Sequence, residues 1–174
     1  MALVEQLPAD SYLKERHIRF EVVPHTGTYT AKSEARAMGL PGDYVLKAVI
    51  LRLHDGYAMA VVPASRRVDL SLVAGLIRKQ EVRRATESEI AERFPGFDLG
   101  ALPPLPGLLG LRAFVDSGVL ERDEVAFADG SRTESIIASP RELFWGEDVF
   151  VAPISREPEV WGPWGFEGDA IRFG

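Results

Sequence analysis

The sequence predicts an α+β fold in which helices pack on a mixed, mainly antiparallel sheet. Two apolar runs, residues 44–53 and 57–62, are joined across Asp55-Gly56, a residue pair typical of a tight hairpin turn. The expected helices and strands are interspersed without the regular alternation of βαβ units, which disfavours a doubly wound parallel sheet. The chain also lacks a Walker A loop and a GxGxxG motif after a strand, which disfavours nucleotide-cofactor enzymes.

Length and composition are those of one ordinary globular domain. The chain has 174 residues, of which 46% are hydrophobic and 26% are charged. Its 20 basic and 26 acidic residues give a net charge of −6, which argues against broad binding to DNA or to a membrane surface. The absence of cysteine excludes disulfides, a cysteine nucleophile and thiolate metal sites. No apolar run is long enough to span a bilayer and the start has no signal-peptide pattern, so we expect a cytoplasmic protein.

The first half of the chain combines capped helices with the hairpin. Thr30 and Asp69 are N-cap residues, and Gly39 followed by Pro41 ends the second helix. The expected helices are residues 9–16, 31–39 and 70–77, and the expected strands are 19–23, 44–53, 57–62 and 82–85.

The second half repeats these signals around one irregular segment. Thr86 to Glu89 has the capping-box pattern of a helix that ends before Pro95, and Ser139-Pro140 begins another helix. The strands expected here are residues 111–116, 124–128 and 132–138, with Asp129-Gly130 as a turn. Residues 96–110 are rich in glycine and proline, which excludes a regular element, yet their leucines indicate packing on the core. A long apolar loop of this kind is more often functional than a linker.

Lys47 is the only charged residue in an otherwise apolar strand. It lies in YVLKAVIL, where both strand faces are apolar, so its ammonium must reach water, pair, or face a polar cavity. A functional lysine and a lysine that protects an edge strand from aggregation are both open interpretations.

Three further patterns are candidates for chemistry. Gly100 followed by Pro103-Pro104 can fix backbone N–H groups toward a cleft, where they would hold a carbonyl oxygen or an oxyanion, or it is a rigid connector. Arg66-Arg67, just after the second hairpin strand, would contact phosphates or remain a solvated pair. The histidines lack metal-ligand spacing, so we expect no metal; His25 is a candidate to border a pocket, and His54 lies in a turn.

Taken together, these segments resemble the YbaK/EbsC family of freestanding aminoacyl-tRNA deacylases, which are similar to the editing insertion domain of bacterial prolyl-tRNA synthetase. Three landmarks occur in the family's order: the Thr-Ala helix start at Thr30, the strand lysine Lys47, and a GxxxP loop at Gly100 to Pro104. The resemblance implies a strongly curved sheet surrounded by helices. The resemblance covers roughly residues 10–153, so we expect an editing domain over residues 1–155, followed by an aromatic tail over 156–174 that lies outside the resemblance.

The resemblance further implies hydrolysis of the ester that joins a wrong amino acid to the 3′ end of a tRNA, without metal or organic cofactor. The implied substrate is a small amino acid mischarged by prolyl-tRNA synthetase, and an aminoacyl-tRNA synthetase is a further expected partner. Lys47 would orient the substrate through its carbonyl or terminal phosphate, and the backbone at Gly100 and Ala101 would hold the aminoacyl group. Further substrate contacts are expected from Thr30, Val62, Ala64, Ala101, Leu102, Pro104 and Gly130, and tRNA contacts from Arg66 and Arg67.

The chain departs from the family pattern near the expected pocket. A Ser-x-Gly of many members reads Ala128-Asp129-Gly130 here, an aspartate of some members falls on Ser135, and Leu105-Pro106 replace a Phe-Gly pair. These departures keep a second interpretation open, a non-catalytic module that binds a tRNA acceptor end or an aminoacyl ligand. A generic small-molecule hydrolase would need a nucleophile or metal that the sequence does not supply. The tail aromatics Trp161, Trp164 and Phe166 are expected to dock on the core or a partner chain rather than stack on a base.

Overall fold

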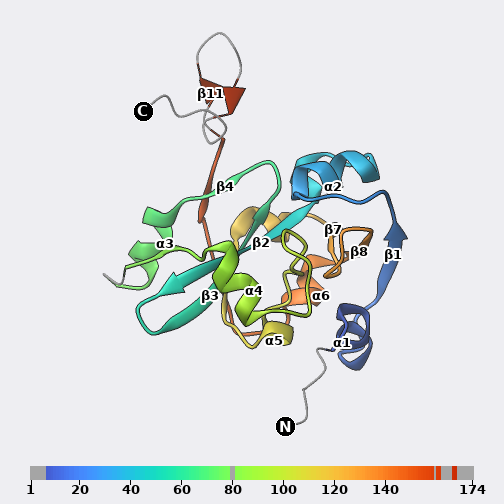
Figure 1. Cartoon of the computed structure of the whole chain (residues 1–174), viewed down its shortest axis with the longest axis horizontal. Coiled ribbons are helices and arrows are strands. Elements are labelled where there is room, and N and C mark those ends of the chain that lie inside the picture. The colour runs from blue at the N-terminus through green and yellow to red at the C-terminus, as the bar shows by residue number, and fades with distance from the viewer. Residues whose placement is uncertain (1–6, 79–80, 159, 162–165, 168–174) are drawn as a thin grey trace.

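The protein is described here by a computed structural model that covers residues 7–78, 81–158, 160–161 and 166–167. Figure 1 shows helices arranged around a central hairpin and two sheets. The helices are α1 (Ala9–Glu15), α2 (Ala31–Met38), α3 (Leu70–Leu76), α4 (Glu87–Arg93), α5 (Pro106–Leu109), α6 (Pro140–Phe144) and the 3-10 turns η1 (Gly42–Tyr44) and η2 (Ser117–Glu121).

The strands form a mixed set of sheets, as the sequence predicts. The main strands are β1 (Phe20–Pro24), β2 (Leu46–Leu53), β3 (Gly56–Pro63), β5 (Arg83–Arg84), β6 (Ala113–Asp116), β7 (Val125–Ala128), β8 (Glu134–Ala138) and β9 (Val149–Ala152). Five of them form a sheet in the order β5-β2-β3-β6-β9, and three form a sheet in the order β1-β8-β7. The pairs β3·β6 and β6·β9 are parallel, and the other pairs of these two sheets are antiparallel.

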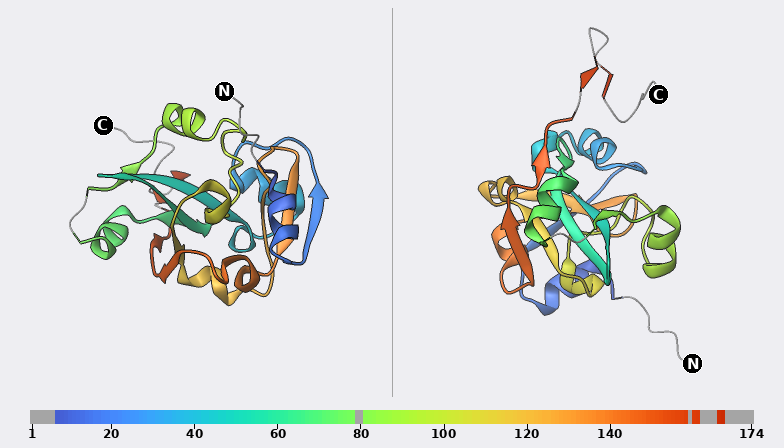
Figure 2. Two further views of the ribbon diagram at one scale, coloured as in Figure 1. Left: turned by 90° about the horizontal axis from the view of Figure 1, so that it is seen from below. Right: turned by 90° about the vertical axis from the view of Figure 1, so that its left-hand side faces the viewer.

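The two sheets meet at one residue pair. Val45, just before β2, forms an isolated parallel bridge with Ala126 of β7. The two sheets are seen together in the left view of Figure 2. Strong curvature of a single sheet is not confirmed, because the strands of the described residues divide into separate sheets and none is strongly curled.

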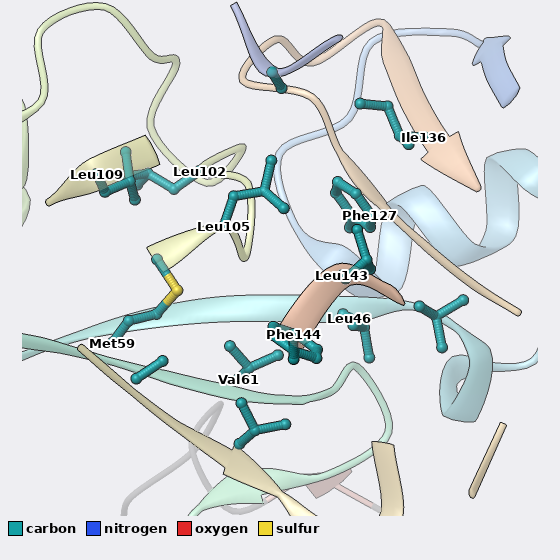
Figure 3. Packing of buried hydrophobic residues seen from close by; sticks show 14 of the residues in the cluster. Leu46, Met59, Val61, Leu102, Leu105, Leu109, Phe127, Ile136, Leu143 and Phe144 are labelled. Carbon is teal, nitrogen blue, oxygen red and sulfur yellow. The ribbon is translucent and has the colours of Figure 1, made fainter. Parts of the chain in front are cut away.

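The core consists of three groups of buried side chains separated by the sheets. The largest group lies on the β2 face that carries Leu46 and Ile50, where Leu102 and Leu105 of the 96–110 segment cover it (Figure 3). A second group, which includes Leu51, lies on the opposite face of β2. Both faces of this strand are therefore apolar, as predicted.

The capping residues identified in the sequence predict most helix ends correctly. Thr30, Asp69, Thr86 and Ser139 all accept backbone N–H bonds as N-caps. The expectation that residues 96–110 contain no regular element is wrong, because Pro106–Leu109 form the single turn α5. Proline occupies its first position, where no N–H is needed, and Gly110 ends it in the left-handed conformation (φ +69°).

The C-terminal part of the chain continues as three short strands. β10 (Ser155–Arg156) pairs antiparallel with β4 (Arg67–Val68), and β11 (Val160–Trp161) pairs with β12 (Phe166–Glu167). The expected boundary at residue 155 thus falls inside a paired strand, and the two-part division stays a prediction. The expected docking of Trp161, Trp164 and Phe166 concerns side chains outside the part of the chain that the structure describes.

Candidate functional site

Gly100 is held in a conformation and a space that favour glycine. Its φ of +81° lies in the left-handed region, and a Cβ atom there would overlap the carbonyl oxygen of Tyr29. The loop therefore packs backbone to backbone on the segment that leads into α2. Gly100 itself is exposed, while Ala101 is buried behind it.

The same loop also contacts the turn between β7 and β8. Asp98 donates its N–H to the carbonyl oxygen of Gly130 at 2.8 Å. A Cβ on Gly130 (φ +112°) would lie 2.6 Å from the ring of Phe97, so this approach too depends on glycine. Gly100 and Gly130, two residues predicted for one site, are thus brought to one loop cluster.

Arg132 joins these segments. Its guanidinium lies 4.5 Å from the ring centroid of Tyr29 and donates from Nη2 to the carbonyl oxygen of Leu99 at 3.0 Å. Its own carbonyl oxygen accepts the N–H of Thr28 at 2.9 Å. Thr30 follows Tyr29 directly as the N-cap of α2, so a third predicted residue belongs to the cluster, although its hydroxyl is used in a capping box with Ser33.

Lys47 lies on β2 directly opposite Val62 of β3 and is half-buried. It follows the bridge residue Val45 by two positions, so its side chain leaves the same strand face as Val45. Ala128 likewise follows Ala126, the other residue of this bridge, by two positions, and the two segments run parallel at the bridge. Lys47 thus lies on the β2 face opposite the one that Leu102 covers, and a cleft shared by Lys47 and Gly100 stays a prediction.

A buried polar chain lies next to this region. Glu34 of α2 and Ser135 of β8 are 3% and 0% exposed and hydrogen-bond to each other. The Ser135 hydroxyl also lies 2.8 Å from Nε2 of His25. Burial raises the pKa of the Glu34 carboxyl, while the Ser135 hydrogen bond opposes that increase.

The family described as the aminoacyl-tRNA editing domain matches residues 25–144, which is more than half of the chain. The chain belongs to the aminoacyl-tRNA editing domain family. The matched range begins at His25 and includes Gly100, Gly130 and Lys47.

Curated relatives of this editing domain are much longer proteins. Proline–tRNA ligase of Thermotoga neapolitana is 25% identical over 119 residues, covering 63% of this chain and 20% of the ligase. Proline–tRNA ligase of Fervidobacterium nodosum is 30% identical over 87 residues, covering 50% of this chain and 15% of the ligase. The editing domain therefore spans about a fifth or less of the ligases that it matches.

Solved structures of similar size share the fold. A protein proposed to be a trans-editing enzyme for prolyl tRNA synthetase is 28% identical with a TM-score of 0.69, over 83% of this chain and 92% of that one. Hypothetical protein APE2540 is 24% identical with a TM-score of 0.76, over 84% of this chain and 98% of that one, which supports the fold alone.

Three of the side chains expected to contact the substrate do not lie in one group of buried residues. Leu102, Val62 and Ala64 belong to three different groups of buried side chains and are 8%, 0% and 1% exposed. Val62 and Ala64 therefore present almost no surface to a ligand in this structure. Pro104 is likewise buried, so of the predicted loop residues only Gly100 is exposed.

The arginine pair is used within the chain. Arg66 donates from Nε to the Ser155 hydroxyl at 2.6 Å and from Nη2 to the Ser155 carbonyl oxygen at 3.1 Å. Arg67 lies in β4, opposite Arg156 of β10. At least Arg66 thus has a structural role in fastening β10, and its tRNA contact stays a prediction.

The described residues contain neither a metal-ligating cluster nor a membrane-spanning helix. Within residues 7–78, 81–158, 160–161 and 166–167 no three metal-ligating side chains gather in one place. Over the same ranges no helix has the length and apolar character to cross a bilayer.

A groove of about 1080 Å³ involves β1, β7, β8 and η2, and it contains none of the predicted site residues. Its lining includes five carboxylates, Glu21, Glu121, Asp123, Glu124 and Glu142, and two arginines, Arg19 and Arg122.

Proposed function

We propose that this editing domain hydrolyses the ester between a wrong amino acid and the 3′ end of a tRNA, acting as a trans-editing enzyme. The observation that supports this proposal most is that the exposed Gly100 packs on the Tyr29 carbonyl while its loop bonds to Gly130. We call this contact between the two segments the Gly100 wall. The family match supports an editing role, and the similar structure proposed as a trans-editing enzyme supports a protein that acts apart from the synthetase.

The loop offers a backbone donor for the ester carbonyl. Ala101 already donates its N–H to the carbonyl oxygen of Asp98 at 3.0 Å. Of the two backbone donors expected there, the N–H of Gly100 is therefore the one for the substrate. A fixed N–H of this kind stabilises the oxyanion that forms when water attacks an ester, and no reorganisation is needed at that moment.

Lys47 is proposed to orient the other end of the substrate. A lysine ammonium suits the carbonyl or the phosphate of the terminal adenosine because it is a compact point charge. The attacking water is proposed to lose its proton to the substrate's own ribose hydroxyl, so the chain need not supply a side-chain base. That hydroxyl passes its own proton to the neighbouring esterified ribose oxygen, which leaves the carbonyl carbon as an alcohol, and the oxygen of the water becomes part of the carboxyl of the released amino acid.

The proposed substrate is a small amino acid on a tRNA that prolyl-tRNA synthetase mischarges, and that synthetase is a proposed partner. The curated relatives are prolyl-tRNA ligases, which supports this choice. The net acidic lining of the large groove would repel phosphates, so we place the tRNA on the Gly100 side instead. Because a pocket discriminates one methylene by only about 1–3 kcal/mol, exclusion of larger side chains would do most of the selecting.

The test is a deacylation screen over a panel of tRNAs carrying correct and incorrect amino acids. Loss of a small amino acid from a mischarged tRNA, with correct prolyl-tRNA left intact, supports the proposal. Turnover of none of the tRNAs, or equal turnover of all of them, contradicts it.

A binding module is the second candidate, and the departures at Ala128 and Ser135 favour it. Ser135 is fully buried and bonded to Glu34, so it offers no group to a ligand. Saturable binding of an uncleaved aminoacyl-tRNA in that screen, without release of amino acid, would select this candidate.

A further inference from the structure

Three side chains form a hydrogen-bonded chain that ends beside the Gly100 wall. Ser135 bonds to the Glu34 carboxyl, and its hydroxyl oxygen lies 2.8 Å from Nε2 of His25. The other ring nitrogen, Nδ1, lies 2.7 Å from the carbonyl oxygen of Thr26. The chain thus connects the buried carboxyl of α2 to the backbone that leads to Tyr29.

The directions of these bonds fix the number of protons. The Thr26 carbonyl oxygen only accepts, so Nδ1 of His25 must carry a proton. The Ser135 hydroxyl has one proton, which goes either to the Glu34 carboxylate or to Nε2. In the first case Nε2 must donate to the serine oxygen, and the ring is an imidazolium. In the second case Glu34 must be a carboxylic acid that donates to Ser135.

Both arrangements therefore hold one proton more than an ionised Glu34 beside a neutral imidazole. Without that proton, one ring nitrogen presents a lone pair to an oxygen lone pair. Either the contact to the Thr26 carbonyl or the contact to Ser135 is then lost, because an acceptor cannot pair with an acceptor.

We propose that Glu34, Ser135 and His25 share one proton and act as positioning residues, holding residues 26–30 against Gly100. The effect of this proton sharing on activity rests on the proposed function, whereas the proton sharing itself does not. Both ring nitrogens of His25 are engaged within the chain, so this histidine positions the wall and does not act as the base.

The surrounding charges are consistent with a proton held at this place. Desolvation raises the pKa of Glu34, and the nearby Asp129 carboxylate raises it further, while Ser135 and His25 lower it. Asp129 also hydrogen-bonds Glu134, whose carboxyl pKa it raises. On β2, Lys47 leaves the strand face of Val45, which packs in one buried group with Ala35 of α2.

The held segment reaches the wall within three residues. Two residues after Thr26, the N–H of Thr28 bonds to the carbonyl oxygen of Arg132. The next residue is Tyr29, whose carbonyl occupies the space beside Gly100. A change at the Thr26 carbonyl would therefore shift the backbone that sets the position of Gly100. Misplacement of a site group by about 1 Å costs up to about a hundredfold in rate.

The first test is NMR of the full chain and does not depend on activity. In the wild type, Nδ1 of His25 is expected to carry a proton, and the ring and the Glu34 carboxyl are expected to hold one further proton between them. Ser135→Ala should break the hydrogen-bonded connection between the ring and Glu34 and shift the backbone amides of Tyr29 and Gly100. Ser88→Ala, on the exposed face of α4, and His54, in its exposed turn, serve as references. An Nδ1 without a proton in the wild type, or Tyr29 and Gly100 amides that stay unchanged in Ser135→Ala, overturns the proposal.

The second test is the pH profile of deacylation. Ser135→Ala is expected to lower kcat about tenfold or more with KM nearly unchanged, and to remove the alkaline limb that follows loss of the shared proton. An unchanged pH profile, with the variant folded by circular dichroism, overturns the positioning role. If the wild type deacylates no tRNA, the proposed function fails, and the proton at Nδ1 and the Tyr29 and Gly100 amides still decide this proposal.

Discussion

The carbonyl oxygen of Tyr29 occupies the space that a side chain on Gly100 would need. Two segments about seventy residues apart in the sequence therefore touch through their backbones. Such a contact is rigid, because neither partner has a side chain that can rotate away, and rigidity is what a site needs to hold an ester carbonyl.

Gly100→Ala is expected to destabilise the fold and to reduce deacylation more than stability alone explains. The strain of a left-handed alanine costs about 1–2 kcal/mol, and the overlap with Tyr29 adds about 1–3 kcal/mol. Gly110→Ala is the matched control, because Gly110 also has a left-handed φ of +69° but nothing within 4 Å of its Cβ position. Urea unfolding of both variants measures the difference, and equal losses would show that the close approach is unimportant.

Lys47→Met is expected to abolish deacylation while leaving the fold intact. Methionine keeps most of the apolar length of the side chain and removes the ammonium, so packing on β2 is preserved. The control is Lys14→Met on the exposed surface of α1, which should retain full activity. Single-turnover rates on a mischarged tRNA make the comparison, and a fully active Lys47→Met would remove this residue from the site.

Glu34→Gln is expected to flatten the pH dependence of stability. Because the folded pKa of Glu34 is raised, its ionisation opposes folding. The contribution of Glu34 to stability should thus be fully present below its ordinary pKa of 4.5 and be lost as the pH rises through the folded pKa. Glutamine does not ionise, so that loss should disappear, whereas Glu21→Gln on exposed β1 should keep it. The free energy of unfolding in urea, measured from pH 4 to 8, decides between these outcomes.

Tyr12 is expected to remain a neutral phenol until strongly alkaline pH. Burial, helped by its 2.5 Å hydrogen bond to Glu147, raises its pKa to about 12. The folded state therefore holds this proton more tightly than the unfolded state, and stability should fall as the pH rises from about 10 to about 12. Tyr12→Phe should remove this dependence and cost about 1–3 kcal/mol, with Tyr44→Phe as the exposed control. The free energy of unfolding, measured at pH 9 and 11, tests this prediction. A Tyr12→Phe variant with unchanged pH dependence would show that Tyr12 is not the group responsible.

Local signals in the sequence are sufficient for most of the helices and for the central hairpin. Thr30 and Thr86 act on backbone groups within a few residues, and Asp55-Gly56 joins strands that are neighbours in the chain. The turn α5 was missed because Pro106 and Gly110 were interpreted as breakers, although they form the two ends of one helical turn.

Contacts between distant residues could not be predicted in the same way. The pairing of β4 with β10 and the parallel order of β3, β6 and β9 have no signature in any one segment. The glycine and proline content of the loop did single out Gly100, because close backbone approach demands that residue. The bond from Glu34 to Ser135 crosses 101 residues and involves no recognisable spacing, so the sequence marked Ser135 only as a departure from the family.

The antiparallel pairing of β1 with β8 has a consequence for synthesis of the chain. Pro24 pairs with Glu134, so the N-terminal strand must wait for more than a hundred further residues before its partner leaves the ribosome. Closing a loop of that length is entropically costly, which makes it a late and slow step of folding. The 25–30 segment, fastened through Thr133 and Ser135, can settle only then. A nascent chain that ends before β8 is therefore expected to contain a folded hairpin and no functional site.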